Sequence, residues 1–160
     1  MPTESPAQRT QRRMRLTWNR YWRDTPIPPL SKADILSLMM SNASRIVMAP
    51  GGPYVIDLTG VAFAAKLLLP GRDVLALALE EYERAAVKHP GMTLECGGHT
   101  DATRLFALVE EIGEVAACLT YDNDAETGHN SDLESEVIQV IALALAWSTR
   151  YLEDGEAGNE

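Results

Sequence analysis

The chain has 160 residues, of which 46% are hydrophobic, and its formal net charge is −9. This length suits one domain with a sizeable core, and this apolar fraction excludes a globally disordered chain. The negative charge argues against a domain that binds nucleic acid non-specifically over its whole surface. Aromatic residues make up only 6% of the chain, while Ala and Leu dominate, which favours helices.

Cysteine usage and hydropathy give the expected compartment. Cys96 and Cys118 form no CxxC pair and no cluster with histidine at zinc-site spacing, so we expect two reduced thiols. No apolar run reaches the roughly 18–20 residues that span a bilayer. The basic N-terminus is not followed by the apolar segment of a signal peptide. We therefore expect a cytoplasmic protein without a membrane partner.

The first 30 residues predict a basic and aromatic arm. Residues 1–23 carry six Arg and one Glu, a net charge of +5. Residues 1–13 are polar and are expected to be frayed. Residues 14–23 interleave Trp and Tyr with Arg at near-helical spacing, which predicts a short amphipathic helix that the prolines of residues 25–29 end. Such an arm can stack on bases and grip phosphates, or it can dock on the acidic body of the protein's own dimer.

Residues 31–70 predict a helical extension. Ser31 is a suitable N-cap for a helix over residues 32–48, whose apolar side chains follow the helical period. Residues 54–58 are compatible with one short strand, although a lone strand lacks a partner to pair with. Residues 61–69 predict a short, buried helix.

Residues 71–152 predict a further helical domain. Asp73 can cap a helix over residues 74–88 that has one apolar stripe and an opposite, charged side. That stripe consists of Leu75, Ala78, Leu79, Tyr82 and Ala86. Thr100 or Asp101 then begins the next helix. Its core stripe is predicted to consist of Leu105, Leu108, Val109, Ile112, Ala116 and Leu119.

Three glutamates lie beside the core stripe of this helix or further round from it. At about 100° per residue, Glu111 flanks the stripe, and Glu114 and Glu110 lie further round the helix. Glu111 and Glu114 are i, i+3 neighbours, so their carboxylates can converge. A polar loop over residues 121–132 separates this helix from the last one.

A capping-box signature, Ser131-x-x-Glu134, predicts the start of the last helix. From residue 137 to residue 147 it is apolar all round except at Gln139, which predicts burial on every side and a need for hydrogen-bond partners at that amide. Glu136 lies one turn earlier on the same face. A domain of this size has few ways to cover such a helix, so we expect a homodimer or higher homo-oligomer, with the partner or the N-terminal extension near Val140, Leu143, Ala144 and Trp147. Residues 153–160 predict an acidic, disordered tail.

Clustered carboxylates on two helices indicate a cation site. Like charges three and four residues apart destabilise a helix by about a few tenths of a kcal/mol each, so something should compensate for them. Mg²⁺ takes oxygen ligands and suits phosphoryl or nucleotidyl chemistry, in which it neutralises charge and activates water. The alternative is an acidic face that is merely solvated. An acidic residue directly ahead of a fully apolar helix face weighs against that alternative.

The pattern Glu110-Glu111-x-x-Glu114, then a loop, then Glu136-x-x-Gln139 resembles the EExxE…ExxD signature of the MazG-like, all-α nucleoside triphosphate pyrophosphohydrolases. The flanking sequences LVEEIGEVA and EVIQVIALALAW are similar to the short members found in bacteria and their phages. The resemblance covers residues 74–152, about half of the chain, and it implies that residues 71–152 form the catalytic helical domain.

This resemblance implies an all-α MazG-like helical bundle that dimerises and cleaves a (d)NTP to (d)NMP and pyrophosphate with Mg²⁺, or Mn²⁺ in its place. It implies metal ligation by Glu111, Glu114 and Glu136, and it places Gln139 where the family usually has a fourth ligand, an Asp. Glu110, the fourth catalytic candidate, would position water or support the site. The departure at Gln139 leaves an alternative, a nucleotide-binding or regulatory protein with weak or no turnover. Proximity in sequence makes Lys88, Arg84 and Arg104 the candidates for binding substrate phosphates.

Overall fold

The computed structural model describes residues 3–27, 29–48, 54–93, 96–120 and 132–157. Within these ranges the chain forms six helices and no strand, which confirms the all-α fold class. The helices are α1 (Pro6–Tyr21), α2 (Lys32–Met48), α3 (Tyr54–Leu68), α4 (Val74–Lys88), α5 (Asp101–Thr120) and α6 (Leu133–Ala157). None of these helices is both long enough and apolar enough to cross a membrane.

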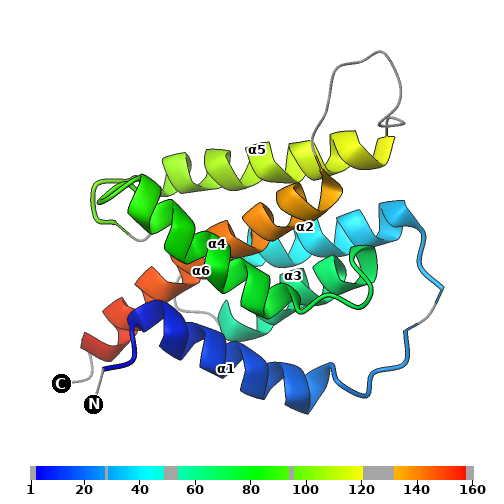
Figure 1. The fold of residues 1–160 in the computed structure, drawn as a ribbon, viewed down its shortest axis with the longest axis horizontal. Helices are drawn as coiled ribbons and strands as arrows, with labels where there is room; N and C mark the ends of the chain where they lie inside the picture. Colours follow the sequence, from blue (N-terminus) through cyan, green and yellow to red (C-terminus); the bar gives the residue numbers. More distant parts are fainter. Residues whose placement is uncertain (1–2, 28, 49–53, 94–95, 121–131, 158–160) are drawn as a thin grey trace.

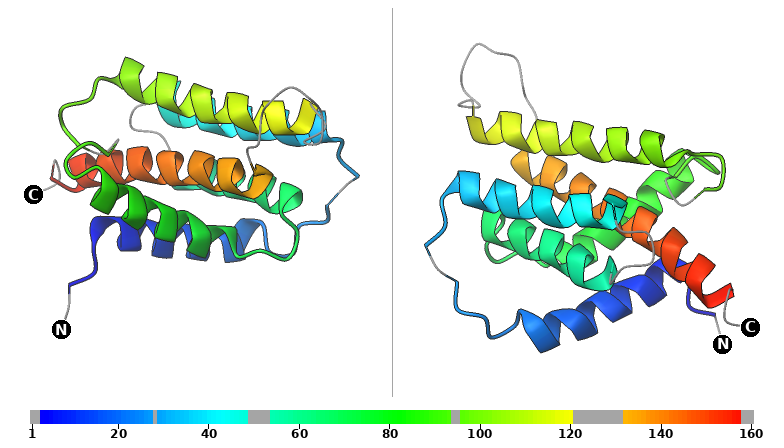
Figure 2. Two further views of the ribbon diagram at one scale, coloured as in Figure 1. Left: turned by 45° about the horizontal axis from the view of Figure 1, so that its top comes forward. Right: turned by 180° about the vertical axis from the view of Figure 1, so that it is seen from behind.

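The six helices pack in three layers of two (Figures 1 and 2). Helices α2 and α5 form one outer layer, α1 and α4 form the other, and α3 and α6 lie between them. Helix α6 contacts each of the other five helices. The beginning of α1 lies beside the later turns of α6, where the hydroxyl of Thr149 donates a hydrogen bond to that of Thr10 over 3.1 Å.

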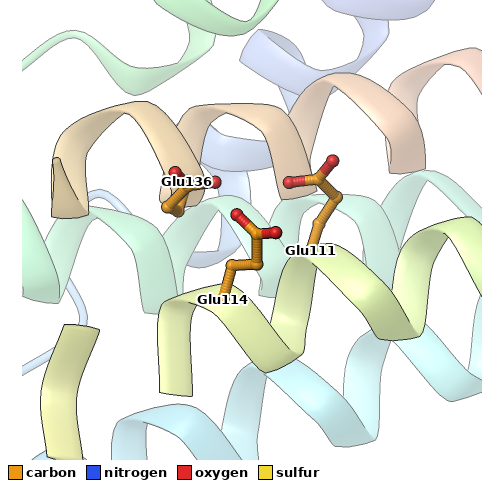
Figure 3. Close-up of side chains that lie close together, drawn as sticks. All are labelled: Glu111, Glu114 and Glu136. Carbon is orange, nitrogen blue, oxygen red and sulfur yellow. The ribbon is translucent and has the colours of Figure 1, made fainter. Parts of the chain in front are cut away.

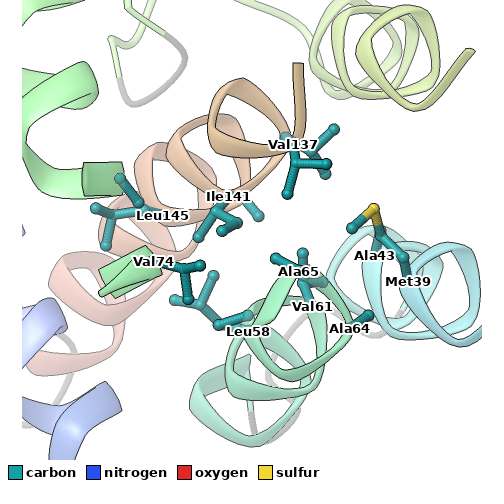
Figure 4. Close-up of a cluster of buried hydrophobic side chains, with 14 of the residues drawn as sticks. Met39, Ala43, Leu58, Val61, Ala64, Ala65, Val74, Val137, Ile141 and Leu145 are labelled. Atoms are coloured by element: carbon teal, nitrogen blue, oxygen red, sulfur yellow. The ribbon is translucent and has the colours of Figure 1, made fainter. Parts of the chain in front are cut away.

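The central layer is apolar on nearly every side, as its position requires. Residues 57–65 of α3 are all buried, and so are residues 140–149 of α6 except Leu143, which is half-buried. A helix that is hydrophobic all round is stable only when neighbours cover each face. Figure 4 shows the resulting core, in which side chains of α2, α3, α4 and α6 interdigitate. The same apolar cluster includes Met14 of α1 and Leu108 of α5, so the helices of the predicted extension share one core with those of the predicted catalytic domain.

The N-terminal arm differs from the prediction because a helix begins within its polar part. The hydroxyl of Ser5 accepts a hydrogen bond from the backbone N–H of Gln8, the Gln8 side chain accepts one from the N–H of Ser5, and Pro6 occupies the first turn. This capping box begins α1 about eight residues earlier than the apolar pattern suggests. The prediction of frayed residues up to residue 13 is therefore wrong.

The aromatic residues of α1 fasten it to α3. The Trp22 ring stacks on Phe63 with centroids 4.6 Å apart, and its indole N–H donates to the hydroxyl of Thr59 over 3.1 Å. The Trp18 ring lies 6.0 Å from Phe63. The Trp18 and Trp22 rings thus dock the arm on its own chain.

Residues 54–58 belong to a helix, so the predicted short strand is wrong. They form the first turns of α3, which continues through the helix that was expected over residues 61–69. Gly60 allows α3 to approach α2 closely, because a Cβ there would lie 2.2 Å from the side-chain oxygen of Asn42. The Asn42 amide turns away and donates to the Leu38 carbonyl over 2.8 Å.

Several predicted helix starts are confirmed. The side chains of Ser31 and Asp73 accept hydrogen bonds from the backbone N–H groups of Asp34 and Ala76, respectively. Thr100 accepts one from the N–H of Thr103 at the start of α5. At the start of α6 the described cap is Asp132, whose carboxylate accepts from the N–H of Glu134 over 3.2 Å. The predicted cap Ser131 and most of the polar loop over residues 121–132 lie outside the described residues.

Helix α6 is covered within a single chain. Val140, Ala144 and Trp147 are 0% exposed, because α1, α3, α4 and α5 surround this segment. The N-terminal extension, one of the two expected neighbours, therefore covers it. The argument for a homodimer from an uncovered α6 does not hold, and homodimerisation stays a prediction that light scattering at tens of micromolar can test. The helix also continues to Ala157, so the prediction of a disordered tail is wrong for residues 153–157.

One member of the predicted α5 stripe was misplaced. Val109 is 56% exposed, whereas Leu108 and Ile112 are buried, and Val115 and Arg104 complete the inner face. The inner face of α5 thus consists of residues 104, 108, 111, 112 and 115, which recur every three to four positions. This rotation places Glu111 next to α6 rather than at the edge of the stripe.

Candidate metal centre

Glu111 and Glu114 owe their positions to the inner face of α5. Leu108, Ile112 and Val115 anchor that face in the core with exposed fractions of 1%, 8% and 0%. Glu111 lies on the same side of the helix and is half-buried. Glu114 follows three residues later, so both side chains emerge on adjacent turns facing α6.

Glu136 is held at the opposite side of the site by the first turns of α6. Its backbone N–H donates to the carbonyl of Asp132, and the Arg72 guanidinium pairs with Glu134 in the same turn over 2.6 Å. Val137 and Ile141 bury the helix directly afterwards. The Glu136 side chain is only 6% exposed, a burial that a carboxylate rarely shows unless it has a compensating partner.

These three carboxylates converge. One oxygen each from Glu111, Glu114 and Glu136 can be chosen such that all of them lie within 4.8 Å of one another. Figure 3 shows Glu111 and Glu114 of α5 pointing toward Glu136 of α6. Three oxygen donors from two helices at this separation can hold a metal ion. The convergence that the i, i+3 spacing predicts on α5 is present, and α6 supplies the third donor.

The electrostatics of the cluster are unfavourable without a cation. Burial, as the largest cause, and the neighbouring charges of Glu136, Glu114 and Glu110 together raise the pKa of Glu111 to about 7. A hydrogen bond to Glu136 also favours the protonated form of Glu111. The Oε2 atom of Glu111 is buried and has no hydrogen-bond partner among the described residues. A buried acceptor without a partner costs about 1–3 kcal/mol, so the folded chain retains a cost that a bound cation would remove.

The charges of these carboxylates also act on Cys118, which lies one turn beyond Glu114. Burial raises the pKa of this thiol, and the charges of Glu136 and Glu114 act in the same direction. A thiol with a raised pKa stays protonated and is a poor metal ligand. The donors at this site are therefore carboxylate oxygens, which hard cations prefer.

Gln139 contacts the cluster through its amide nitrogen. Its Nε2 donates to Oε2 of Glu136 over 3.0 Å. Gln139 is half-buried, and this contact gives its amide a partner and orients Glu136. This is the hydrogen-bonding role expected for Gln139 if it does not ligate a metal. The role of Gln139 as a neutral ligand through its carbonyl oxygen stays a prediction.

A hollow of about 310 Å³ opens beside the cluster. We call it the α4–α6 hollow, because α4 and α6 form its two walls. Glu111 and Gln139 line both this hollow and the carboxylate cluster, so the two are continuous. The remaining lining residues are Glu81, Tyr82, Arg84, Ala85, Lys88, His89, Met92, Thr93, Ala142, Leu143 and Ala146.

The predicted basic residues differ in where they lie. Lys88 and Arg84 line the α4–α6 hollow, and Arg84 also pairs with Glu81 over 2.7 Å. Arg104 does not line it. Its side chain is 4% exposed and its guanidinium donates to the Asp101 carboxylate and to the Cys96 carbonyl, both over 3.0 Å. These bonds give Arg104 a structural task, joining the loop before α5 to the helix. Glu110 is exposed and lies outside the three-carboxylate cluster.

Sequence inspection missed several residues of the hollow. Tyr82 was placed in the core stripe of α4, and His89 was not among the candidates, yet both line the hollow. A usable signal was present in α4, where Glu81, Ala85 and Lys88 recur at i, i+4 and i+7. A small residue between two charged ones on one helix face leaves room for a ligand.

Comparison with known proteins finds no family, no curated protein and no solved structure that matches this chain. The chemistry of the site is therefore argued from its geometry. A convergent carboxylate cluster that adjoins a hollow with cationic and apolar walls can hold a metal ion beside a phosphorylated organic ligand.

Proposed function

We propose that the chain is a Mg²⁺-dependent nucleotide pyrophosphohydrolase that cleaves a (d)NTP to (d)NMP and pyrophosphate. The observation that carries this proposal is the Oε2 atom of Glu111, a buried acceptor without a hydrogen-bond partner among the described residues. It belongs to the three-carboxylate cluster, which adjoins the α4–α6 hollow. The motif resemblance to the MazG-like pyrophosphohydrolases points to the same reaction. A homodimer and a cytoplasmic location belong to this proposal.

The donor set fits Mg²⁺. Glu111, Glu114 and Glu136 offer only hard oxygen donors, and Mg²⁺ binds through a few carboxylates together with water and substrate phosphates. Mn²⁺ accepts the same ligands. When bound, the ion would neutralise phosphate charge and lower the pKa of a coordinated water. Glu110, exposed one residue before Glu111, would help to position water at the rim.

The α4–α6 hollow would hold the nucleotide. Ala142, Leu143 and Ala146 provide an apolar wall, and Tyr82 contributes a planar ring that suits a base. Lys88 and Arg84 provide positive charge for phosphate oxygens at the opposite wall. The carboxylates bind no phosphate by themselves, so substrate affinity should require the cation.

The expected reaction is attack of water on the α-phosphorus. The new bond joins the water oxygen to the α-phosphorus, and the bond from that phosphorus to the bridging oxygen of the β-phosphate breaks. Pyrophosphate leaves with that oxygen, and one proton of the attacking water is released. Orthophosphate as the first product would exclude this assignment.

Turnover of a panel of NTPs and dNTPs with Mg²⁺, followed by separate assays for pyrophosphate and orthophosphate, tests the proposal. The variant Glu114→Gln should lower kcat by about 100-fold, because metal stabilisation of the transition state is worth several kcal/mol and each 1.4 kcal/mol is tenfold. The control Glu83→Gln removes an exposed glutamate of α4 that lines neither the cluster nor the hollow, and it should keep wild-type rates. Wild-type rates in Glu114→Gln would contradict the site.

The alternative is a nucleotide-binding or regulatory protein with weak or no turnover. The observation that favours it is the neutral amide of Gln139, which contributes no charge where a carboxylate would. The same panel separates the two proposals. Saturable, cation-dependent nucleotide binding without pyrophosphate release would support the regulatory protein and exclude the hydrolase.

A further inference from the structure

A second hollow, of about 410 Å³, lies between α1, the end of α3 and the start of α4. We call it the α1–α4 hollow. None of its lining residues belongs to the carboxylate cluster or to the α4–α6 hollow. The residues that matter for its chemistry are Arg15, Trp18, Lys66, Arg72 and Asp73.

The lining of this hollow is positive in a strongly negative protein. Arg15, Lys66 and Arg72 come from three different elements, and Asp73 is the one acidic lining residue. Arg15 pairs with Asp73 over 3.2 Å and so offsets that charge. The local net charge is therefore positive, although the chain as a whole carries −9. Net charge of this sign concentrates anions near the hollow.

Lys66 is the cation whose charge is least compensated. Arg15 is paired with Asp73, and Arg72 is paired with Glu134 over 2.6 Å. Within the described part of the chain no carboxylate pairs with Lys66, and its ammonium lies 5.2 Å from the centroid of the Trp18 ring instead. A cation held over an aromatic ring keeps donors available for a further acceptor.

We propose that the α1–α4 hollow binds a small phosphate-bearing anion. Guanidinium and ammonium groups from three directions match the several oxygens of a phosphate. The half-buried Trp18 ring adds an aromatic wall to the hollow, next to the ammonium of Lys66. Inorganic pyrophosphate and a nucleoside monophosphate share the phosphate chemistry that these cations recognise. This site needs no divalent cation, so it is independent of the proposed hydrolysis.

Calorimetric titration of the full chain with pyrophosphate, and separately with adenosine monophosphate, tests the proposal. EDTA is present throughout, so the carboxylate cluster cannot recruit phosphate through a metal ion. We expect saturable binding that Lys66→Gln weakens about tenfold, because the phosphate loses a charged hydrogen-bond donor. Binding of the monophosphate through Lys66 identifies a nucleotide ligand, and binding of pyrophosphate alone identifies an inorganic one.

A matched variant removes the same charge elsewhere. Lys32→Gln changes an exposed lysine at the start of α2 and should bind as the wild type does. Equal weakening in both lysine variants would show a non-specific effect of net charge and would overturn the proposal, as would the absence of saturable binding.

Tryptophan fluorescence provides a second measurement that does not depend on Lys66 variants. Ligand binding should change the emission of the wild type, and Trp18→Phe should abolish that change while retaining an aromatic ring. A ligand-induced change that persists in Trp18→Phe would place the ligand elsewhere and contradict the assignment.

Discussion

Two charged side chains on the inner face of α5 show opposite ways of burying a charge. Arg104 is 4% exposed, and its guanidinium donates to a carboxylate and a backbone carbonyl. Glu111, two turns later, faces two other carboxylates and has a buried oxygen without a partner. Hydrogen bonds within the fold satisfy the guanidinium of Arg104. The buried oxygen of Glu111 lacks a partner among the described residues and would gain one from a bound cation. A buried charge that the fold leaves uncompensated is therefore the better indicator of a ligand site.

Removing the satisfied charge should cost stability. Arg104→Met is expected to lower the free energy of unfolding by about 2 kcal/mol, because the half-buried Cys96 carbonyl loses its charged donor. Chemical denaturation of the purified variant measures this. The matched change Asp101→Asn, at a carboxylate that is 72% exposed, should cost less than about 1 kcal/mol. Equal losses in both variants would mean that the ion pair, and not the burial, carries the effect.

Removing the uncompensated charge should change how stability depends on pH. The pKa of Glu111 rises from its ordinary 4.5 to about 7 in the folded chain, mainly through burial. The folded state therefore binds this proton more tightly than the unfolded state, and the resulting stabilisation, present below pH 4.5, is lost as the pH rises through about 7. Solvent screening of this half-exposed group reduces the loss to about 1–2 kcal/mol.

The variant Glu111→Gln isolates this contribution. Its free energy of unfolding should fall less than that of the wild type between pH 4.5 and pH 8 in metal-free buffer. Parallel pH profiles for the two proteins would show that the charge of Glu111 is compensated within the fold. The contrast between Glu111 and Arg104 would then be wrong.

The contact between Gln139 and Glu136 should set metal affinity. Gln139→Leu removes the amide that orients Glu136 and is expected to weaken Mg²⁺ binding about tenfold, the loss typical of a residue that orients a metal ligand. Gln139→Asp should strengthen binding, because hard-cation affinity rises with ligand charge. Magnesium titrations and thermal melts of both variants measure these effects. A lower Tm in Gln139→Asp with an unchanged metal response would remove Gln139 from the site.

Local signals in the sequence predict much of this fold, and long-range packing determines the rest. The bounds of α2 and α4 follow from their caps and apolar period, and the convergence of Glu111 with Glu114 follows from their spacing. Residues 54–58 contain β-branched Val55 and Ile56, so local propensity did not separate helix from strand. The packing of α3 in the central layer, with neighbouring helices around it, favours the helix over the strand in this segment.

What surrounds a segment is less accessible to sequence inspection. The cover of α6 by α1 depends on contacts such as Thr149 with Thr10, which are far apart in the chain. The α4–α6 hollow likewise exists only because α4 and α6 are placed side by side. The carboxylate motif was visible from spacing, but the walls of the adjoining hollow were not.

Direct metal binding tests the central claim that the carboxylate cluster is a cation site. Mn²⁺ bound by the full chain at pH 8 can be counted by electron paramagnetic resonance, with Mg²⁺ as competitor. We predict saturable binding that Mg²⁺ displaces, that Glu136→Gln weakens at least about tenfold and that the exposed-site control Glu83→Gln leaves unchanged. Binding of equal strength in the wild type and Glu136→Gln, or no saturable binding in the wild type, would contradict it.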